Sequence, residues 1–162
     1  MAYSLLIDAS TTSLAIAEVG AANLGVTIDF AHSLYADEQP AFAAALTARK
    51  SKLLGVHLND GHAKRDDGLM VALVHEMATL ELLRDVHRAG FDSTICFDAF
   101  PDASGLDPGG ECTASIRTVR RLLAGVHAMA GDNRLTHARS AQDPFVAQDI
   151  VRLAAAKGAL TV

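Results

Sequence analysis

Residues 53–60 read LLGVHLND, a short apolar run that ends in polar side chains. Two further runs share this form, GVTIDFAH at residues 25–32 and STICFD at residues 93–98. Each run is almost continuously hydrophobic and rich in β-branched or large apolar residues, a pattern typical of parallel strands that are buried on both faces. The sequence therefore predicts three parallel strands that end in acidic or imidazole groups.

Helical patterns lie between and after these runs. Residues 37–50 predict a helix with a proline near its start and a basic last turn. Apolar residues recur at helical spacing in residues 74–86, before a stop at Gly90, and again in residues 116–126. A last helix is predicted over residues 143–157. Alternating strands and helices are typical of right-handed βαβ units, so we predict an α/β fold with a parallel sheet.

Two segments are less regular. Residues 4–8 are compatible with a strand, whereas residues 11–19 favour a helix that ends at Gly20. Residues 102–110 follow the third predicted strand and are rich in glycine and proline, which predicts a long loop. No low-complexity tract or linker divides the chain, so we expect residues 1–162 to form a single domain.

The composition restricts the class of protein. Half of the 162 residues are hydrophobic and a fifth are charged, which is enough for one domain with a core. A net charge of −5 with scattered basic residues argues against a nucleic-acid partner held by phosphate contacts. Two cysteines are too few for a secreted disulfide framework, and no membrane span or signal peptide is visible. We therefore expect a soluble, cytoplasmic protein without a membrane partner.

Polar side chains stand at the carboxyl ends of the three predicted strands. Asp29, His57 and Asp98 occupy comparable positions, and adjacent parallel strands would aim them at one point. That edge of a parallel sheet is where ligands bind. Two carboxylates and an imidazole suit Mg²⁺, Mn²⁺, Co²⁺ or Zn²⁺. Each of these residues alone is typical of a helix cap or a turn. The metal site is favoured because such a residue recurs at the end of all three predicted strands.

Further polar residues follow the first two strands. His32 comes three residues after Asp29, and the loop after the second strand carries Asn59, Asp60, His62, Lys64, Asp66 and Asp67. We expect some of these groups to complete a second cation site beside the first. The remaining histidines, His75, His87, His127 and His137, are assigned no role. Cys96 shares the parity of Asp98 along the third strand and is expected to be a small buried hydrophobe.

Three segments resemble a known family. They are NLGVTIDFAH at residues 23–32, LLGVHLNDGHAKRDDGLMV at residues 53–71 and STICFDAFPD at residues 93–102. They are similar to the C-terminal half of the xylose-isomerase-like TIM barrels, above all to bacterial sugar isomerases related to L-rhamnose isomerase. The resemblance extends over nearly the whole chain. It implies that the chain is the C-terminal part of an incomplete (β/α)₈ barrel whose N-terminal strands are absent.

The resemblance also implies a function and a set of site residues. Asp29, His57 and Asp98 would bind a first divalent cation, while His32 and Asp66 would hold a second and act in catalysis with Asp67. The implied reaction is aldose–ketose interconversion of a small sugar, in which hydrogen moves between C1 and C2. We further expect two residues to contact the substrate, Asn59 and Lys64.

The chain departs from the family pattern in three places. A glutamate ligand at the end of the family's fifth strand has no counterpart, because the chain begins after that point. Ala72 stands where the family usually has glycine after LMV, and Gly68 follows Asp67 where a further acid is common. A TIM barrel needs eight strands and about 250 residues. We therefore expect open strand edges and a homo-oligomer that covers them.

Three other functions fit the sequence less well. A sugar 3-epimerase of the same fold would use a pair of glutamates, whereas the third strand ends in Asp98. A truncated remnant without catalysis would serve assembly alone. A metal-dependent DNA repair endonuclease of similar barrel type is disfavoured by the acidic charge and by the lack of its extra histidines.

Overall fold

The computed structural model describes residues 4–62, 64–100, 105 and 107–157. These residues form a mixed α/β fold with a three-stranded parallel sheet in the order β1-β2-β3. The strands are β1 (Val26–Asp29), β2 (Leu53–Leu58) and β3 (Ile95–Phe97). The three predicted strands and their parallel direction are therefore confirmed.

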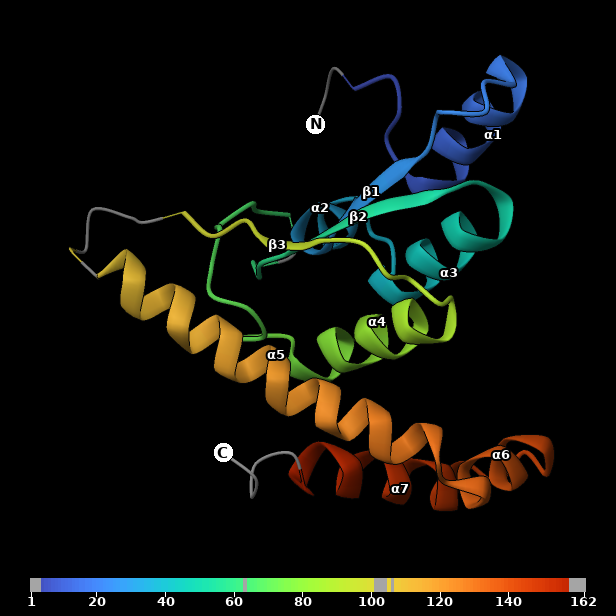
Figure 1. The fold of residues 1–162 in the computed structure, drawn as a ribbon, viewed down its shortest axis with the longest axis vertical. Helices are drawn as coiled ribbons and strands as arrows, with labels where there is room; N and C mark the ends of the chain where they lie inside the picture. The colour runs from blue at the N-terminus through green and yellow to red at the C-terminus, as the bar shows by residue number, and fades with distance from the viewer. Residues whose placement is uncertain (1–3, 63, 101–104, 106, 158–162) are drawn as a thin grey trace.

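Helices connect and follow the strands. They are α1 (Ala9–Val19), α2 (Phe30–Tyr35), α3 (Pro40–Lys50), α4 (Glu76–Arg88), α5 (Pro108–Ala130), α6 (Asn133–Ser140) and α7 (Pro144–Lys157). Figure 1 shows α2, α3 and α4 on one side of the sheet, with the long helix α5 running past α4 and the pair α6 and α7 against α5. None of the described helices is both long and apolar enough to cross a membrane.

The two faces of the sheet differ. Ile28, Val56 and Leu58 point to the helices and are almost completely buried in the core. Side chains on the opposite face alternate with them, and this face carries the exposed Thr27 and Cys96. The prediction that the strands are buried on both faces is therefore wrong for the described residues, and so is the prediction of a buried Cys96.

The helix ends follow the capping residues in the sequence. The Asp8 carboxylate accepts the Thr11 N–H at 2.6 Å, and Gly20 ends α1 with a φ of 66°. The predicted stop at Gly90 is confirmed, with a φ of 70°. Residues 4–8 do not form a strand. The only regular element in the first twenty described residues is therefore the helix α1.

Two helices differ from the sequence-based expectation. Residues 102–110 are not all loop, because Asp107 caps α5 and Pro108 occupies its first turn. The described residues do not include 101–104 and 106. These positions cover part of the predicted loop and the end of the third segment that resembles the family. The short helix α6 was not predicted, because its polar sequence NRLTHARS carries little apolar periodicity.

Candidate metal centre

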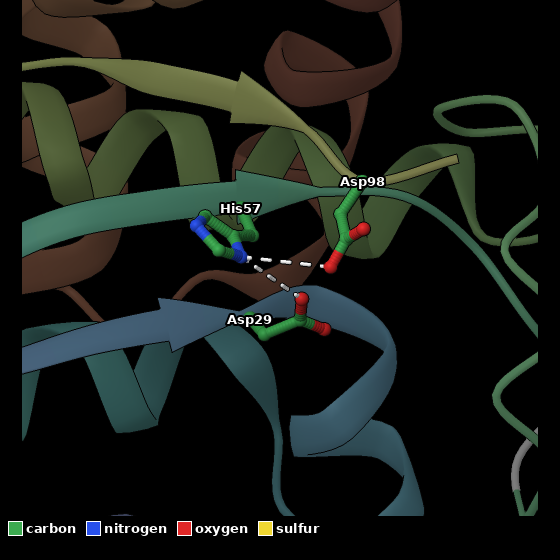
Figure 2. A group of neighbouring side chains, drawn as sticks. All are labelled: Asp29, His57 and Asp98. Carbon is green, nitrogen blue, oxygen red and sulfur yellow. Dashed lines mark ion pairs between the residues drawn. The ribbon is translucent and has the colours of Figure 1, made fainter. Parts of the chain in front are cut away.

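Three strand ends bring Asp29, His57 and Asp98 together. Asp29 is the last residue of β1 and pairs in register with His57 of β2. Asp98 directly follows β3, where its N–H donates to the Leu58 carbonyl at 3.1 Å and so prolongs the pairing of β2 with β3. The parallel register therefore places the three side chains at one edge and on the uncovered face of the sheet, where Figure 2 shows them turned toward one another.

The distances between these groups suit a shared cation. The His57 Nδ1 lies 3.6 Å from the Asp29 Oδ2 and 3.6 Å from the Asp98 Oδ2. These separations are too long for good hydrogen bonds. Two donor atoms that bind one cation at about 2.1 Å lie roughly 3 to 3.5 Å apart. One ligand atom from each residue lies within 4.8 Å of the others, so the donor set fits a divalent cation.

The Asp29 carboxylate is held in place from two directions. Its Oδ1 caps α2 by accepting the His32 N–H at 2.9 Å. The Asn59 amide lies behind it, with Nδ2 3.4 Å from the Asp29 Oδ1, while the Asn59 Oδ1 accepts the Ala31 N–H at 2.9 Å. Asn59 is only 1% exposed. A substrate contact by Asn59 stays a prediction, and its observed contacts orient the Asp29 carboxylate, a candidate metal ligand.

His32 and Asp66 also come together. The His32 Nε2 lies 3.0 Å from the Asp66 Oδ2, and both side chains are partly exposed. A hollow of about 180 Å³ opens beside Asp29 and His32. In the part of the chain that the structure describes, only Asp29, His57 and Asp98 form a group of three close metal-binding side chains. The expected second cation site is thus represented by the His32–Asp66 pair alone.

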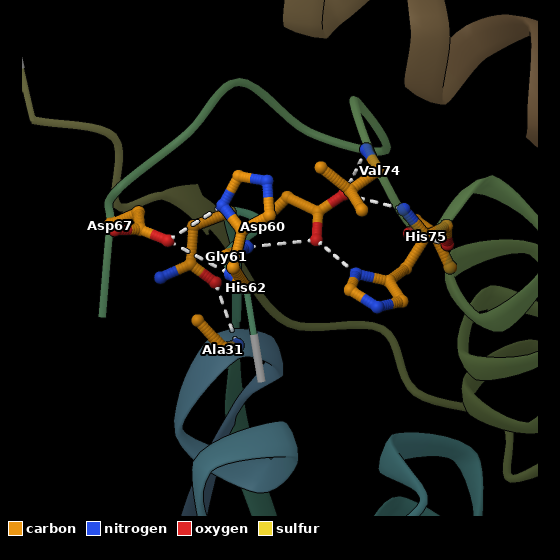
Figure 3. Close-up of polar contacts among 9 residues, drawn as sticks. Ala31, Asp60, Gly61, His62, Asp67, Val74 and His75 are labelled. Carbon is orange, nitrogen blue, oxygen red and sulfur yellow. Dashed lines mark hydrogen bonds and ion pairs between the residues drawn. The ribbon is translucent and has the colours of Figure 1, made fainter. Parts of the chain in front are cut away.

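Asp67 makes its contacts within its own loop. Its Oδ2 accepts the His62 N–H at 2.9 Å and lies 2.9 Å from the His62 Nδ1, as Figure 3 shows, and its Oδ1 lies 3.2 Å from the Arg65 Nε. The hydrogen bond from the His62 backbone N–H lowers the pKa of the Asp67 carboxyl below its ordinary value. Catalysis by Asp67 stays a prediction, and its visible contacts stabilise the loop.

Lys64 is also engaged within the protein. Its Nζ donates to the Tyr35 carbonyl at 3.0 Å and forms an ion pair with Asp37. These contacts join the loop after β2 to the end of α2. The predicted contact between Lys64 and a substrate stays a prediction.

Asp60 connects the two ends of the loop between β2 and α4, a structural role that the sequence pattern did not predict. The residue is fully buried, and its two oxygens accept the N–H groups of Gly61, Val74 and His75 at 2.7–2.8 Å. The His75 Nδ1 lies 2.7 Å from the Asp60 Oδ1, so His75, which was assigned no role, is its partner (Figure 3). Among the loop residues from which a second cation site could be completed, Asp60 uses both of its oxygens for contacts within the protein.

The same loop contains two residues with positive φ. Gly68 has a φ of 59°, and a Cβ at this position would lie 2.3 Å from the Phe100 ring. Ala72, which stands where the resembling family has glycine, has a φ of 61°. An L-residue with a side chain is strained in this left-handed region. The backbone at residue 72 thus has the conformation that glycine adopts most easily.

The fold and this site define a mixed α/β chain with a candidate divalent-cation centre at the carboxyl edge of a parallel sheet. A scan against models of protein families found no match for the chain, and a search of curated proteins found none either.

Proposed function

We propose that this chain is the metal-bearing part of a sugar isomerase with a xylose-isomerase-like barrel, and that it interconverts an aldose and a ketose. The observation that carries the proposal is the convergence of Asp29, His57 and Asp98 from three successive parallel strands. Consecutive parallel strands with helices on one side only are the arrangement of a (β/α)₈ barrel wall. A doubly wound sheet would carry helices on both faces. The single-sided arrangement therefore supports an incomplete barrel.

The residues present fit a divalent cation of the Mn²⁺, Co²⁺, Mg²⁺ or Zn²⁺ class. The Oδ2 atoms of Asp29 and Asp98 and the Nδ1 of His57 face the shared position. When bound, such a cation supplies Lewis-acid polarisation of the sugar carbonyl and hydroxyl oxygens. Asn59 keeps the Asp29 carboxylate turned to that position, because it binds both Asp29 and the start of α2.

His32 and Asp66 supply the acid–base groups of this proposal. The imidazole and the carboxylate are 3.0 Å apart, close enough to share a proton, and His32 lines the hollow next to Asp29. A sugar hydroxyl placed in that hollow would exchange its proton with the His32 imidazole while Asp66 orients the ring. Asp67 supports this pair indirectly, because it fixes the loop that presents Asp66.

The uncovered face of the sheet supports self-association. Thr27 and Cys96 are exposed on the face that carries the metal ligands, and each outer strand has one unpaired edge in the described part of the chain. Unpaired strand edges attract further chain segments. The proposal therefore includes a homo-oligomer in which a second copy covers this side of the sheet.

Metal titration tests the proposal. We expect Mn²⁺ to bind the full chain with saturation in isothermal titration calorimetry, and His57→Ala and Asp98→Asn each to weaken binding at least tenfold. His137→Ala is the matched control, since His137 is exposed on α6. Binding that is absent, or equal in His57→Ala, would remove the metal centre.

Turnover tests the reaction. Pentoses and hexoses are incubated with the protein and each of the four cations, and C1–C2 interconversion is followed by NMR. Product formed by the parent chain and lost in His32→Ala supports the isomerase. Deuterium exchange at C3 without C1–C2 interconversion would instead show an epimerase.

A further inference from the structure

A larger hollow lies far along the chain from the metal ligands, between α4, α5, α6 and α7. Its volume is about 470 Å³, which lies in the range of small-molecule pockets. Figure 1 shows these four helices stacked on the side of the sheet away from its uncovered face. Apolar side chains from all four helices line it, namely Met77, Leu80, Met129, Leu135, Ala147 and Val151.

The polar lining of this hollow is mainly cationic. Arg84 of α4, Arg139 of α6 and Arg152 of α7 all line it. The only acidic side chain of the lining is Glu81, whose carboxylate already accepts a hydrogen bond from the Gln39 Nε2 at 2.6 Å. Three guanidinium groups around one hollow are notable in a chain whose net charge is −5.

These arginines are only partly neutralised. Asp85 pairs with Arg84 at 3.6 Å but is shared with Arg88 at 3.3 Å, and the charge of Glu81 also acts on Arg84. Arg139 and Arg152 form no ion pair with any residue that the structure describes. Burial, followed by the nearby charge of Arg139, lowers the pKa of the Arg84 guanidinium. Two like charges thus stand close together at an apolar hollow, and an anion between them would relieve their repulsion.

A neighbouring hollow extends the same feature. It has a volume of about 510 Å³ and shares Arg84, Arg139, Met129 and Leu135 with the first hollow. The guanidinium groups of Arg84 and Arg139 therefore border both hollows. Guanidinium groups bind carboxylates and phosphates through paired hydrogen bonds, and unbranched methionine side chains adapt to an apolar tail.

We propose that the hollow between α4, α5, α6 and α7 binds a small amphiphile with one anionic headgroup, a carboxylate or a phosphate. The headgroup lies between Arg84 and Arg139, and the apolar tail lies along Met77, Leu80 and Met129. Arg152 contributes a third positive charge at the same hollow. This proposal is independent of the metal centre and of the proposed isomerase activity.

The experiment uses the full chain and four probes below their micelle concentrations: decanoate, decyl phosphate, decanol and inorganic phosphate. We expect saturable one-to-one binding of at least one anionic amphiphile by calorimetry, and at least tenfold weaker binding of decanol and of inorganic phosphate. The tighter of decanoate and decyl phosphate identifies the headgroup. Arg139→Gln is expected to weaken binding about tenfold, because it removes a charge-assisted contact.

Two variants keep the test independent of folding. Arg139 and Arg152 are both exposed, so Arg152→Gln is a second probe that is expected to leave the thermal midpoint unchanged while it weakens binding. Arg120→Gln is the matched control, since Arg120 is exposed on α5 and does not line the hollow. The proposal is overturned if neither amphiphile binds, if decanol binds as tightly as decanoate, or if Arg139→Gln and Arg152→Gln both bind like the parent. Binding to anionic vesicles without binding of a monomeric amphiphile would overturn it as well.

Discussion

The buried Asp60 carboxylate and the partly exposed His75 imidazole meet at 2.7 Å, at the two ends of the loop that carries Asp66 and Asp67. Asp60 lies two residues after the end of β2 and His75 directly precedes α4, so one polar contact joins the end of a strand to the start of the next helix. Backbone pairing between Asp60 and Leu69 adds to this contact. A buried carboxylate is therefore one of the main contacts that fix the position of the loop.

Replacing that carboxylate is expected to be costly. Asp60→Ala leaves the backbone N–H groups of Gly61, Val74 and His75 without their acceptor. Each buried unpaired group costs about 1–3 kcal/mol, so we expect a loss of about 3 kcal/mol or more in the free energy of unfolding. Urea denaturation measures this loss. Asp92→Asn, at an exposed position, serves as control, and an equal loss in both variants would contradict the role of Asp60.

A substitution at the strained alanine is expected to act in the opposite direction. Ala72→Gly removes the penalty of a Cβ at a φ of 61° and is expected to raise the free energy of unfolding by about 0.5–1 kcal/mol. Ala124→Gly, in the middle of α5, is the matched control and is expected to lower it by about 1 kcal/mol. Both variants are compared by urea denaturation. A loss of stability in Ala72→Gly would show that the backbone at residue 72 is not strained.

Two aspartates are expected to make stability depend on acid. Backbone N–H groups of Thr11 and His62 lower the pKa of Asp8 and Asp67, respectively, below the ordinary value of 3.8. The unfolded chain therefore takes up these protons more readily than the folded chain. The stabilisation is complete above the ordinary value and is lost as the pH falls through the lower folded-state value.

Unfolding measured in urea between about pH 6 and pH 3 tests this dependence. Asp67→Asn is expected to lose stability at the upper end of that range and to show a flatter decline toward acid. Asp92→Asn is expected to keep the decline of the parent chain. A decline in Asp67→Asn as steep as that of the parent would assign the acid sensitivity to other groups.

The orientation of Asp29 by Asn59 is expected to appear in metal affinity. Asn59→Ala removes the amide that lies 3.4 Å from the Asp29 Oδ1, and we expect Mn²⁺ affinity to fall about tenfold to a hundredfold. Calorimetry on the folded variant at a temperature well below its thermal midpoint separates this effect from unfolding. Unchanged affinity would show that Asp29 keeps its orientation through the α2 cap alone.

The sequence predicted the convergence of Asp29, His57 and Asp98, for a simple physical reason. Asp29, His57 and Asp98 each lie at a strand end, and parallel strands that follow one another along the chain also lie side by side in this sheet. Adjacent strand ends then meet at one edge, so local patterns were sufficient. The membership in a sugar-isomerase family and the reaction stay predictions.

Other features of the structure could not be predicted, because they depend on contacts between residues that are distant in the sequence. The pairing of Asp60 with His75 spans a loop without periodicity, so no local pattern predicted this contact. The exposure of Cys96 depends on what covers the open face of the sheet, which the composition of β3 does not specify. The start of α5 at Pro108 was missed because proline and glycine favour a loop when the Asp107 cap is not considered.

The uncovered face of the sheet links assembly to ligand chemistry. Thr27 and Cys96 stand on the same surface as Asp29 and His57, so any chain segment that seals this surface also forms the missing wall of the cation pocket. If the proposed self-association occurs, a dilute solution would leave the candidate cation position open to water, whereas a concentrated solution would exclude water from it. The proposal then implies that metal affinity rises with protein concentration.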